Sequence, residues 1–142
     1  MVDRKIIHSP GTRDFYTDIG ACEAVVVGDV VHVSGQVGWD ESLKVAETFE
    51  AQVRQTFTNM AAALRQAGCT LDDVTDLRMY VVQQSGTPLM QMIETAFKIK
   101  KDMAPGNVCA ATGLAVSALA LPELMIECAA VAHRPRAIAP AA

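Results

Sequence analysis

The sequence predicts one α+β domain in which a mixed β-sheet carries two helices on one of its faces. The 142 residues are about the size of a single domain. Valine-rich runs alternate with two segments of helical period, in the order strand, hairpin, helix, strand, helix and two strands. Hairpins separated by helices favour one mixed sheet covered on one side. We expect the domain to span residues 1–134 and to be followed by a flexible tail over residues 135–142.

The first strands are predicted from β-branched runs and turn residues. A short strand is expected at residues 5–8, and the runs 23–27 and 30–34 flank Gly28-Asp29, which predicts a hairpin. The two glycines within residues 35–38 predict a bend or bulge at the end of the hairpin.

The first helix is predicted at residues 47–67, with Gly68 as its C′ residue. Its apolar residues recur at steps of three and four: Phe49, Val53, Phe57, Met60, Leu64 and Ala67. A second helix begins around Thr87-Pro88, with Thr87 as N-cap, and ends before residues 104–106.

Three further strands are predicted at residues 77–82, 108–116 and 124–132. The last two are apolar throughout, which is typical of strands covered on both faces. Two helices on one face cannot provide that cover, so we expect a second copy of the chain to pack against the other face.

Composition excludes several classes of function. The formal net charge is −4 and the pI about 5.3, which disfavours nucleic acid as a partner. No apolar stretch reaches the ~20 residues of a membrane helix, and the charged start is unlike a signal peptide, so we expect a cytoplasmic protein without a membrane partner. Neither the four cysteines nor the histidines have metal-ligand spacing, so no metal is expected.

An ordered set of short segments gives the chain a family resemblance. They include Val33-Ser34-Gly35-Gln36, Ala67-Gly68, Leu119–Leu124 and Ile126-Glu127. In their order and spacing, residues 20–133 resemble the RidA (YjgF) family of imine/enamine deaminases. The resemblance implies a chorismate-mutase-like fold, a homotrimer with a small-molecule cleft between subunits, and no cofactor.

The resemblance also implies site residues and two departures from the family pattern. Glu127 matches a glutamate that positions or activates the attacking water, and Ser34 matches a serine lining the cleft. The family's substrate-binding arginine would fall at Ala111-Thr112, where this chain has none, so the chain resembles a divergent subgroup. The usual aromatic residue before the hairpin is replaced around Gly20-Ala21. Either the ligand lacks the carboxylate that such an arginine would bind, or another group holds it.

Glu127 stands out from the residues alone, because it is the one charge in an apolar strand. Burial raises the pKa of a carboxyl group and suits it to proton transfer, although a structural glutamate would fit the same pattern. Cys109 is either a packed small residue or a reactive thiol. Glu94 lies either on a helix surface or in the cleft, and Trp39 could be a cleft lid or an interface anchor.

Two functions of different classes follow. The first is hydrolytic deamination of a small reactive imine or enamine in an inter-subunit cleft, with Glu127 as general base and then acid. The alternative is a non-catalytic small-molecule-binding or metabolite-sensing protein that uses the same cleft. The ribonuclease activity attributed to some members of the family is disfavoured by the negative charge.

Overall fold

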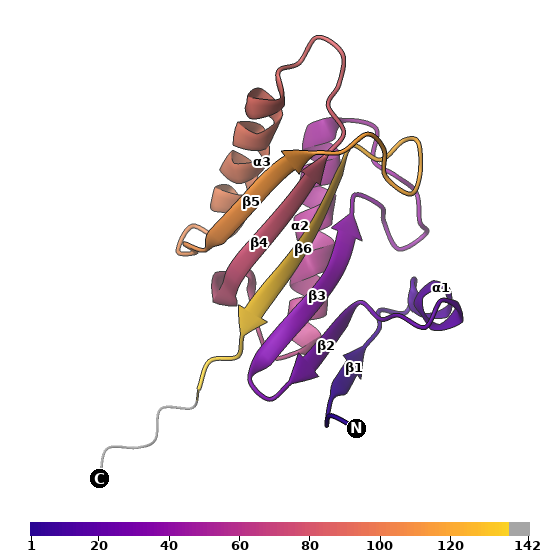
Figure 1. Ribbon diagram of the computed structural model, residues 1–142, viewed down its shortest axis with the longest axis vertical. Coiled ribbons are helices and arrows are strands. Elements are labelled where there is room, and N and C mark those ends of the chain that lie inside the picture. Colours follow the sequence, from indigo (N-terminus) through magenta and orange to yellow (C-terminus); the bar gives the residue numbers. More distant parts are fainter. Residues whose placement is uncertain (137–142) are drawn as a thin grey trace.

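The computed structural model describes residues 1–136 and consists of a six-stranded sheet with helices packed on it (Figure 1). The strand order is β1-β2-β3-β6-β4-β5. The strands are β1 (Lys5–Ile7), β2 (Ala24–Val27), β3 (Val30–Val37), β4 (Val74–Val81), β5 (Ala110–Ala115) and β6 (Ile126–His133). The helices are α1 (Arg13–Asp18), α2 (Phe49–Gln66), the 3-10 turn η1 (Leu71–Asp73) and α3 (Leu89–Met103). Of the tail expected at 135–142, residues 137–142 lie outside the described part of the chain.

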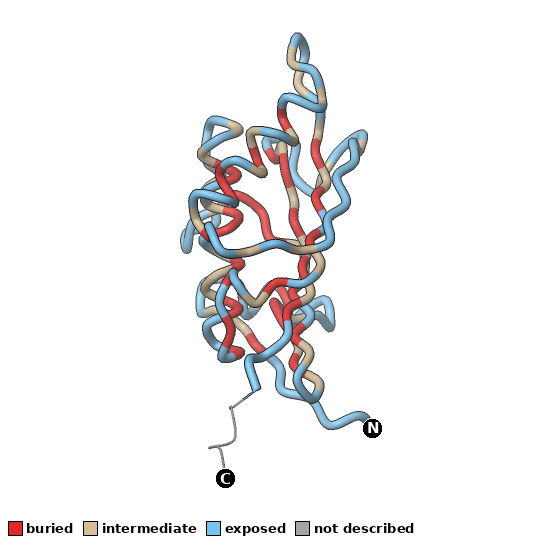
Figure 2. Tube along the Cα trace, turned by 90° about the vertical axis from the view of Figure 1, so that its left-hand side faces the viewer, coloured by how far each residue is buried: buried red, intermediate tan, exposed pale blue. Residues whose placement is uncertain are grey.

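The sheet is mixed, and α2 and α3 lie on the same face of it, which confirms the predicted fold class. β4 and β5 run parallel, whereas the other neighbouring strands pair antiparallel. Seen from the side, buried residues concentrate between the helical layer and the sheet (Figure 2). We call the opposite side, which looks away from α2 and α3, the open face.

The core is formed where the apolar stripe of α2 meets the helix-side residues of the central strands. Phe57, Met60 and Leu64 are fully buried on α2. They belong to one apolar cluster with Met79 of β4 and Cys128 of β6, which are register partners on the same face of the sheet. The alternation along the strands therefore sends every second side chain into this core and the others to the open face.

Local predictions agree with most of the structure and differ in three places. The expected bulge lies between Val33 and Gln36, and Gly68 has the positive φ of a helix-terminating glycine. Helix α1 was not predicted, because six residues are too few to show a helical period. β4 begins at Val74, earlier than predicted. Thr87 is not the N-cap of α3: Pro88 occupies that position and no side chain caps the helix.

The open face is uncovered in a single chain. All six residues of β5 are exposed. On the open face of β6, Glu127, Ala129 and Val131 are half-buried and His133 is exposed. The prediction that strands 108–116 and 124–132 are covered on both faces is thus not met within one chain, since only α2 and α3 cover the sheet. An open face with exposed Leu114 is what a neighbouring subunit would have to cover.

A buried glutamine of α2 fixes the two loops that flank the helix and β6. Gln52 is fully buried. Its amide nitrogen donates to the carbonyl oxygens of Ala46 at 3.0 Å and Glu123 at 2.9 Å, and its amide oxygen accepts from the Met125 N–H at 2.8 Å. Because the Gln52 side chain is buried, these three backbone groups supply the partners that its amide requires. Gly38 passes directly over this residue, where a Cβ would lie 2.5 Å from the Cα of Gln52.

We expect Gln52→Leu to lower the free energy of unfolding by about 3 kcal/mol, because three part-buried backbone groups lose their partners at once. Urea denaturation at fixed protein concentration measures this loss. Gln55→Leu is the matched control, since the Gln55 amide donates only to Asn59, and it should cost about 1 kcal/mol or less. Equal losses in the two variants would contradict the role assigned to Gln52.

Candidate active site

Glu127 places an unpartnered carboxylate on the open face, at the centre of the sheet. Its register partners are Val37 on β3 and Tyr80 on β4. The carboxylate folds over Gly35, where any Cβ would overlap it. It forms no hydrogen bond or ion pair with any described residue. Burial raises the pKa of this carboxyl group above its ordinary value, and no cation opposes that effect.

The bulge of β3 creates the space in which this carboxylate lies. Between Val33 and Gln36 the regular pairing with β6 is interrupted, so Ser34 and Gly35 leave the ladder. Ser34 Oγ donates to the carbonyl oxygen of Cys22 at 2.6 Å, and its N–H donates to the carbonyl oxygen of Glu23 at 2.8 Å. Ser34, predicted as a cleft-lining residue, precedes Gly35, over which Glu127 folds, and its hydroxyl hydrogen is engaged within the chain.

Tyr16 is the residue of this region that sequence reasoning missed. Helix α1 carries it into the structure, where it is buried, and its hydroxyl lies 3.4 Å from the carbonyl oxygen of Gly35. Burial, then the charge of Glu23 and further the charge of Glu127, raise the pKa of Tyr16 to about 12. An aromatic residue therefore does precede the hairpin, but it lies earlier in the chain than Gly20-Ala21, where we expected it to be replaced.

Glu23 is a second carboxylate close to Tyr16, and it has a structural role. It is 5% exposed. It accepts hydrogen bonds from the N–H of Ser9 at 2.7 Å and from the hydroxyl of Thr12. These bonds hold the N-terminal turn that leads into α1, and so they help to position Tyr16.

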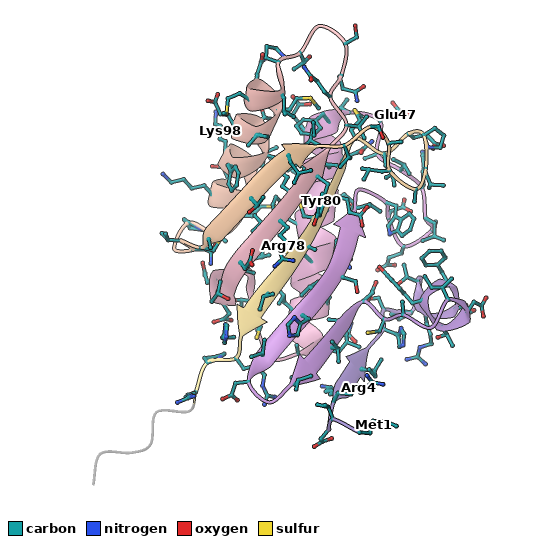
Figure 3. All side chains as sticks on the ribbon, viewed as in Figure 1. Met1, Arg4, Glu47, Arg78, Tyr80 and Lys98 are labelled. Carbon is teal, nitrogen blue, oxygen red and sulfur yellow. The ribbon has the colours of Figure 1, made fainter. Side chains whose placement is uncertain are left out.

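The predicted residues of the penultimate strand lie on the far side of β4 from Glu127. Thr112 is on the open face and pairs in register with Arg78, whereas Glu127 pairs with Tyr80. Ala111 pairs with Leu77 of the core and so belongs to the helix side. Figure 3 shows Arg78 and Tyr80 on the side of β4 that looks away from the helices. Within one chain, Thr112 and Glu127 are thus two strands apart, about 10 Å by the spacing of strands.

Cys109 and Glu94 lie on elements other than those that flank Glu127. Cys109 lies just before β5, and its Sγ is 3.7 Å from Nζ of the buried Lys100, a cation that was not expected there. Glu94 is exposed on α3, in the helical layer across the sheet from the open face.

Trp39 lies beyond the end of β3, with its ring 6.3 Å from that of Phe15 in an edge-on arrangement. It lines a hollow of about 660 Å³ between the N-terminal turn and the outer face of α2. This hollow is separate from the open face that carries Glu127.

Besides Glu127, the open face carries an ion pair between two residues of β4. Arg78 contacts Asp76 at 3.3 Å, and both side chains are substantially exposed. With His32 and Val131 they line a small hollow of about 120 Å³. Among residues 1–136 no three His, Cys, Asp or Glu side chains are grouped as a metal site, and no described helix is long and apolar enough to cross a membrane.

Comparison with known proteins places this architecture in one family. The family model described as Endoribonuclease L-PSP matches residues 17–134. The RutC family protein YjgH of Escherichia coli is 38% identical over 80 residues, which is 56% of this chain and 61% of that relative. The chain thus matches less than two thirds of the length of this curated relative.

Solved structures match over more of the chain. The structure of protein YjgH has a TM-score of 0.76 and 30% identity, covering 96% of this chain and 100% of that one. A Mycobacterium tuberculosis member of the YjgF/YER057c/UK114 family has a TM-score of 0.77 and 26% identity over 92% of this chain and 99% of that one. RidA from an Antarctic Psychrobacter has a TM-score of 0.70 and 26% identity, over 79% of this chain and 86% of its own. Because the match runs from before the bulged hairpin to beyond the glutamate of the last strand, this chain belongs to the YjgF/RidA family.

Proposed function

We propose that the protein hydrolyses small reactive imines or enamines, with Glu127 as the general base that activates water. The observation that carries this proposal is the half-buried carboxylate over Gly35, which has no partner among the described residues. A structural glutamate at this depth would be bound by protein donors, because a buried charge without partners is costly. A carboxylate left free is available to bind water or a ligand.

The surroundings of Glu127 suit it to proton transfer. Burial raises the pKa of its carboxyl group, which brings the group closer to the pH at which a base is both ionised and strong enough to act. In the proposed reaction Glu127 takes a proton from water as the water oxygen attacks the C=N carbon. It returns that proton to the nitrogen, which gives a carbinolamine. Glu127 then takes the proton of the carbinolamine hydroxyl and passes it to the nitrogen as the C–N bond breaks, so that ammonia and a carbonyl product leave and Glu127 is ionised again.

We propose further that the working site lies between subunits of a homotrimer. Strand β4 separates Thr112 from Glu127 within one chain, so the two can share a ligand only if they come from different copies. All residues of β5 are exposed, and Leu114 presents an apolar side chain on the same open face as Tyr80 and Glu127. Packing this face against another copy would remove the apolar surface from water and enclose the carboxylate.

Glu127→Gln should abolish any acceleration of imine hydrolysis, because an amide cannot accept the proton of water. We expect a loss of about 100-fold or more. Imines would be generated in situ by an amino-acid oxidase, and ammonia release would be timed with and without the protein. Glu50→Gln is the matched control, as Glu50 is exposed in the first turn of α2.

The wild-type result in this assay also separates the two classes of function. Acceleration that survives in Glu127→Gln would contradict the assigned base. A wild-type protein that accelerates no acidic, neutral or basic imine would instead be a non-catalytic binder.

The pH dependence should follow the raised pKa of Glu127. The base works only when ionised, so kcat/KM should fall as the pH drops through this pKa, and the acid limb should lie above pH 4.5, the ordinary value for glutamate.

The raised pKa of Glu127 also predicts how the stability of the protein depends on pH, independently of any enzymatic activity. Because folding raises this pKa, ionised Glu127 destabilises the folded state at higher pH. Glu127→Gln should therefore be more stable than the wild type at pH ~7, with the difference disappearing as the pH falls below the ordinary value. Urea denaturation across pH measures this, and equal stability at every pH would contradict the assigned desolvation.

Leu114→Glu should dissociate the trimer, because it puts a charge into the face that the copies would share. Sedimentation velocity distinguishes a monomer from a trimer. Met90→Glu, at an exposed apolar residue of α3, should leave the assembly unchanged. A wild-type protein that sediments as a stable monomer would contradict the inter-subunit site.

A further inference from the structure

The carboxylate of Glu127 lies over Gly35 and forms no ion pair with a cation among residues 1–136. No Lys or Arg of the described chain contributes to the pKa of Glu127, for which burial is the cause. A ligand group placed beside Glu127 therefore meets negative charge that no cation of its own chain offsets.

The hydrogen-bonding groups around Glu127 are mostly acceptors or are already engaged. Ser34 Oγ donates to Cys22, and the amide nitrogen of Gln36 donates to the carbonyl oxygen of Ser34 at 3.1 Å. The hydroxyl of Tyr16 faces the carbonyl oxygen of Gly35. Two kinds of group remain for a ligand at this point. The oxygens of Glu127 bind N–H or O–H donors and repel anions, and the hydroxyl of its register partner Tyr80, which has no hydrogen bond among the described residues, can donate or accept.

The arginine on the same face is held elsewhere. Arg78 is paired with Asp76, which precedes it by two residues on β4. Its register partner on β6 is Ala129, whereas the partner of Glu127 is Tyr80. The neighbouring Asp76 offsets part of the guanidinium charge, which lowers its attraction for a further carboxylate.

These observations point to the class of substrate. Resting on the function proposed above, we propose that the substrate is a protonated imine, an iminium ion, with no carboxylate on the reacting carbon. The positive C=N group would be attracted to the ionised oxygens of Glu127, whereas a 2-imino acid would bring its own carboxylate against them.

The reaction balances without any further reactant. Water adds its oxygen to the iminium carbon as Glu127 takes one proton, which gives a neutral carbinolamine. The protonated Glu127 then protonates the nitrogen, the C–N bond breaks, and the remaining hydroxyl proton passes to the departing ammonia. An iminium ion and water thus become a carbonyl compound and an ammonium ion, and Glu127 is ionised again.

A matched pair of imines tests this inference. An amino-acid oxidase acting on leucine gives an imine with the carboxylate, and a flavin-dependent amine oxidase acting on 3-methylbutylamine gives the corresponding imine without it. Ammonia release, or trapping of the surviving imine by semicarbazide, is followed with and without the protein. For each imine, the rate with the protein is divided by the rate without it, so that the different intrinsic reactivities of the two imines cancel. We expect the acceleration for the carboxylate-free imine to be greater by about tenfold or more.

The outcomes separate a failure of the proposed substrate class from a failure of the proposed hydrolysis. Equal or greater acceleration of the 2-imino acid would overturn the substrate class and leave the proposed hydrolysis standing. Acceleration of neither imine would overturn the hydrolysis itself. The variant Arg78→Met adds a second check. We expect it to leave the acceleration of both imines unchanged. If the wild type accelerates hydrolysis of the 2-imino acid and Arg78→Met does not, Arg78 binds the carboxylate and the inference is refuted.

Discussion

The position of β6 between β3 and β4 is the constraint on which the rest of the structure depends. Two antiparallel ladders fix the strand from both sides, and the pleat then sends Ile126, Cys128 and Ala130 into the core. Glu127 and its alternate neighbours must consequently face away from the helices. A slip of register by one residue would exchange the two sets and bury the carboxylate under α2, so the packing of the core also specifies which face carries the acid.

Helix α2 extends this constraint to the loops. Its apolar side covers the centre of the sheet, and on the same helix the amide of Gln52 binds backbone groups on both the loop before α2 and the segment that enters β6. A polar side chain in such a place costs desolvation, which is recovered only when all of its hydrogen-bonding groups are satisfied. The geometry that satisfies it leaves little freedom for the chain just before Glu127.

The chemistry of the candidate site follows from charge as well as from shape. The bulge in β3 opens a space against Gly35, helix α1 brings Tyr16 to its edge, and Glu23 holds the turn before that helix. The two ionisable side chains that lie against Gly35, Tyr16 and Glu127, are both acids. A carboxylate without a cation beside it disfavours anions, and the proposed iminium substrate rests on this property of the described chain.

The sequence by itself determined what depends on neighbours in the chain. The helical period placed α2, the valine runs around Gly28 placed the hairpin, and the glycines after Ser34 placed the bulge. Glu127 could be recognised because a charge within an apolar strand is visible from the strand alone. The family resemblance rested on the same kind of ordered local pattern.

Only the tertiary structure decided which distant segments meet. The parallel pairing of β4 with β5 sets Arg78 beside Thr112, α1 carries Tyr16 to Gly35, and Lys100 approaches Cys109. None of these contacts leaves a periodic signal, because each depends on the register and packing of elements that the chain joins only through long connections. The sequence thus identified the acid of the site, and the fold determined its neighbours, since a carboxylate takes its pKa and its preference for ligands from the groups packed around it.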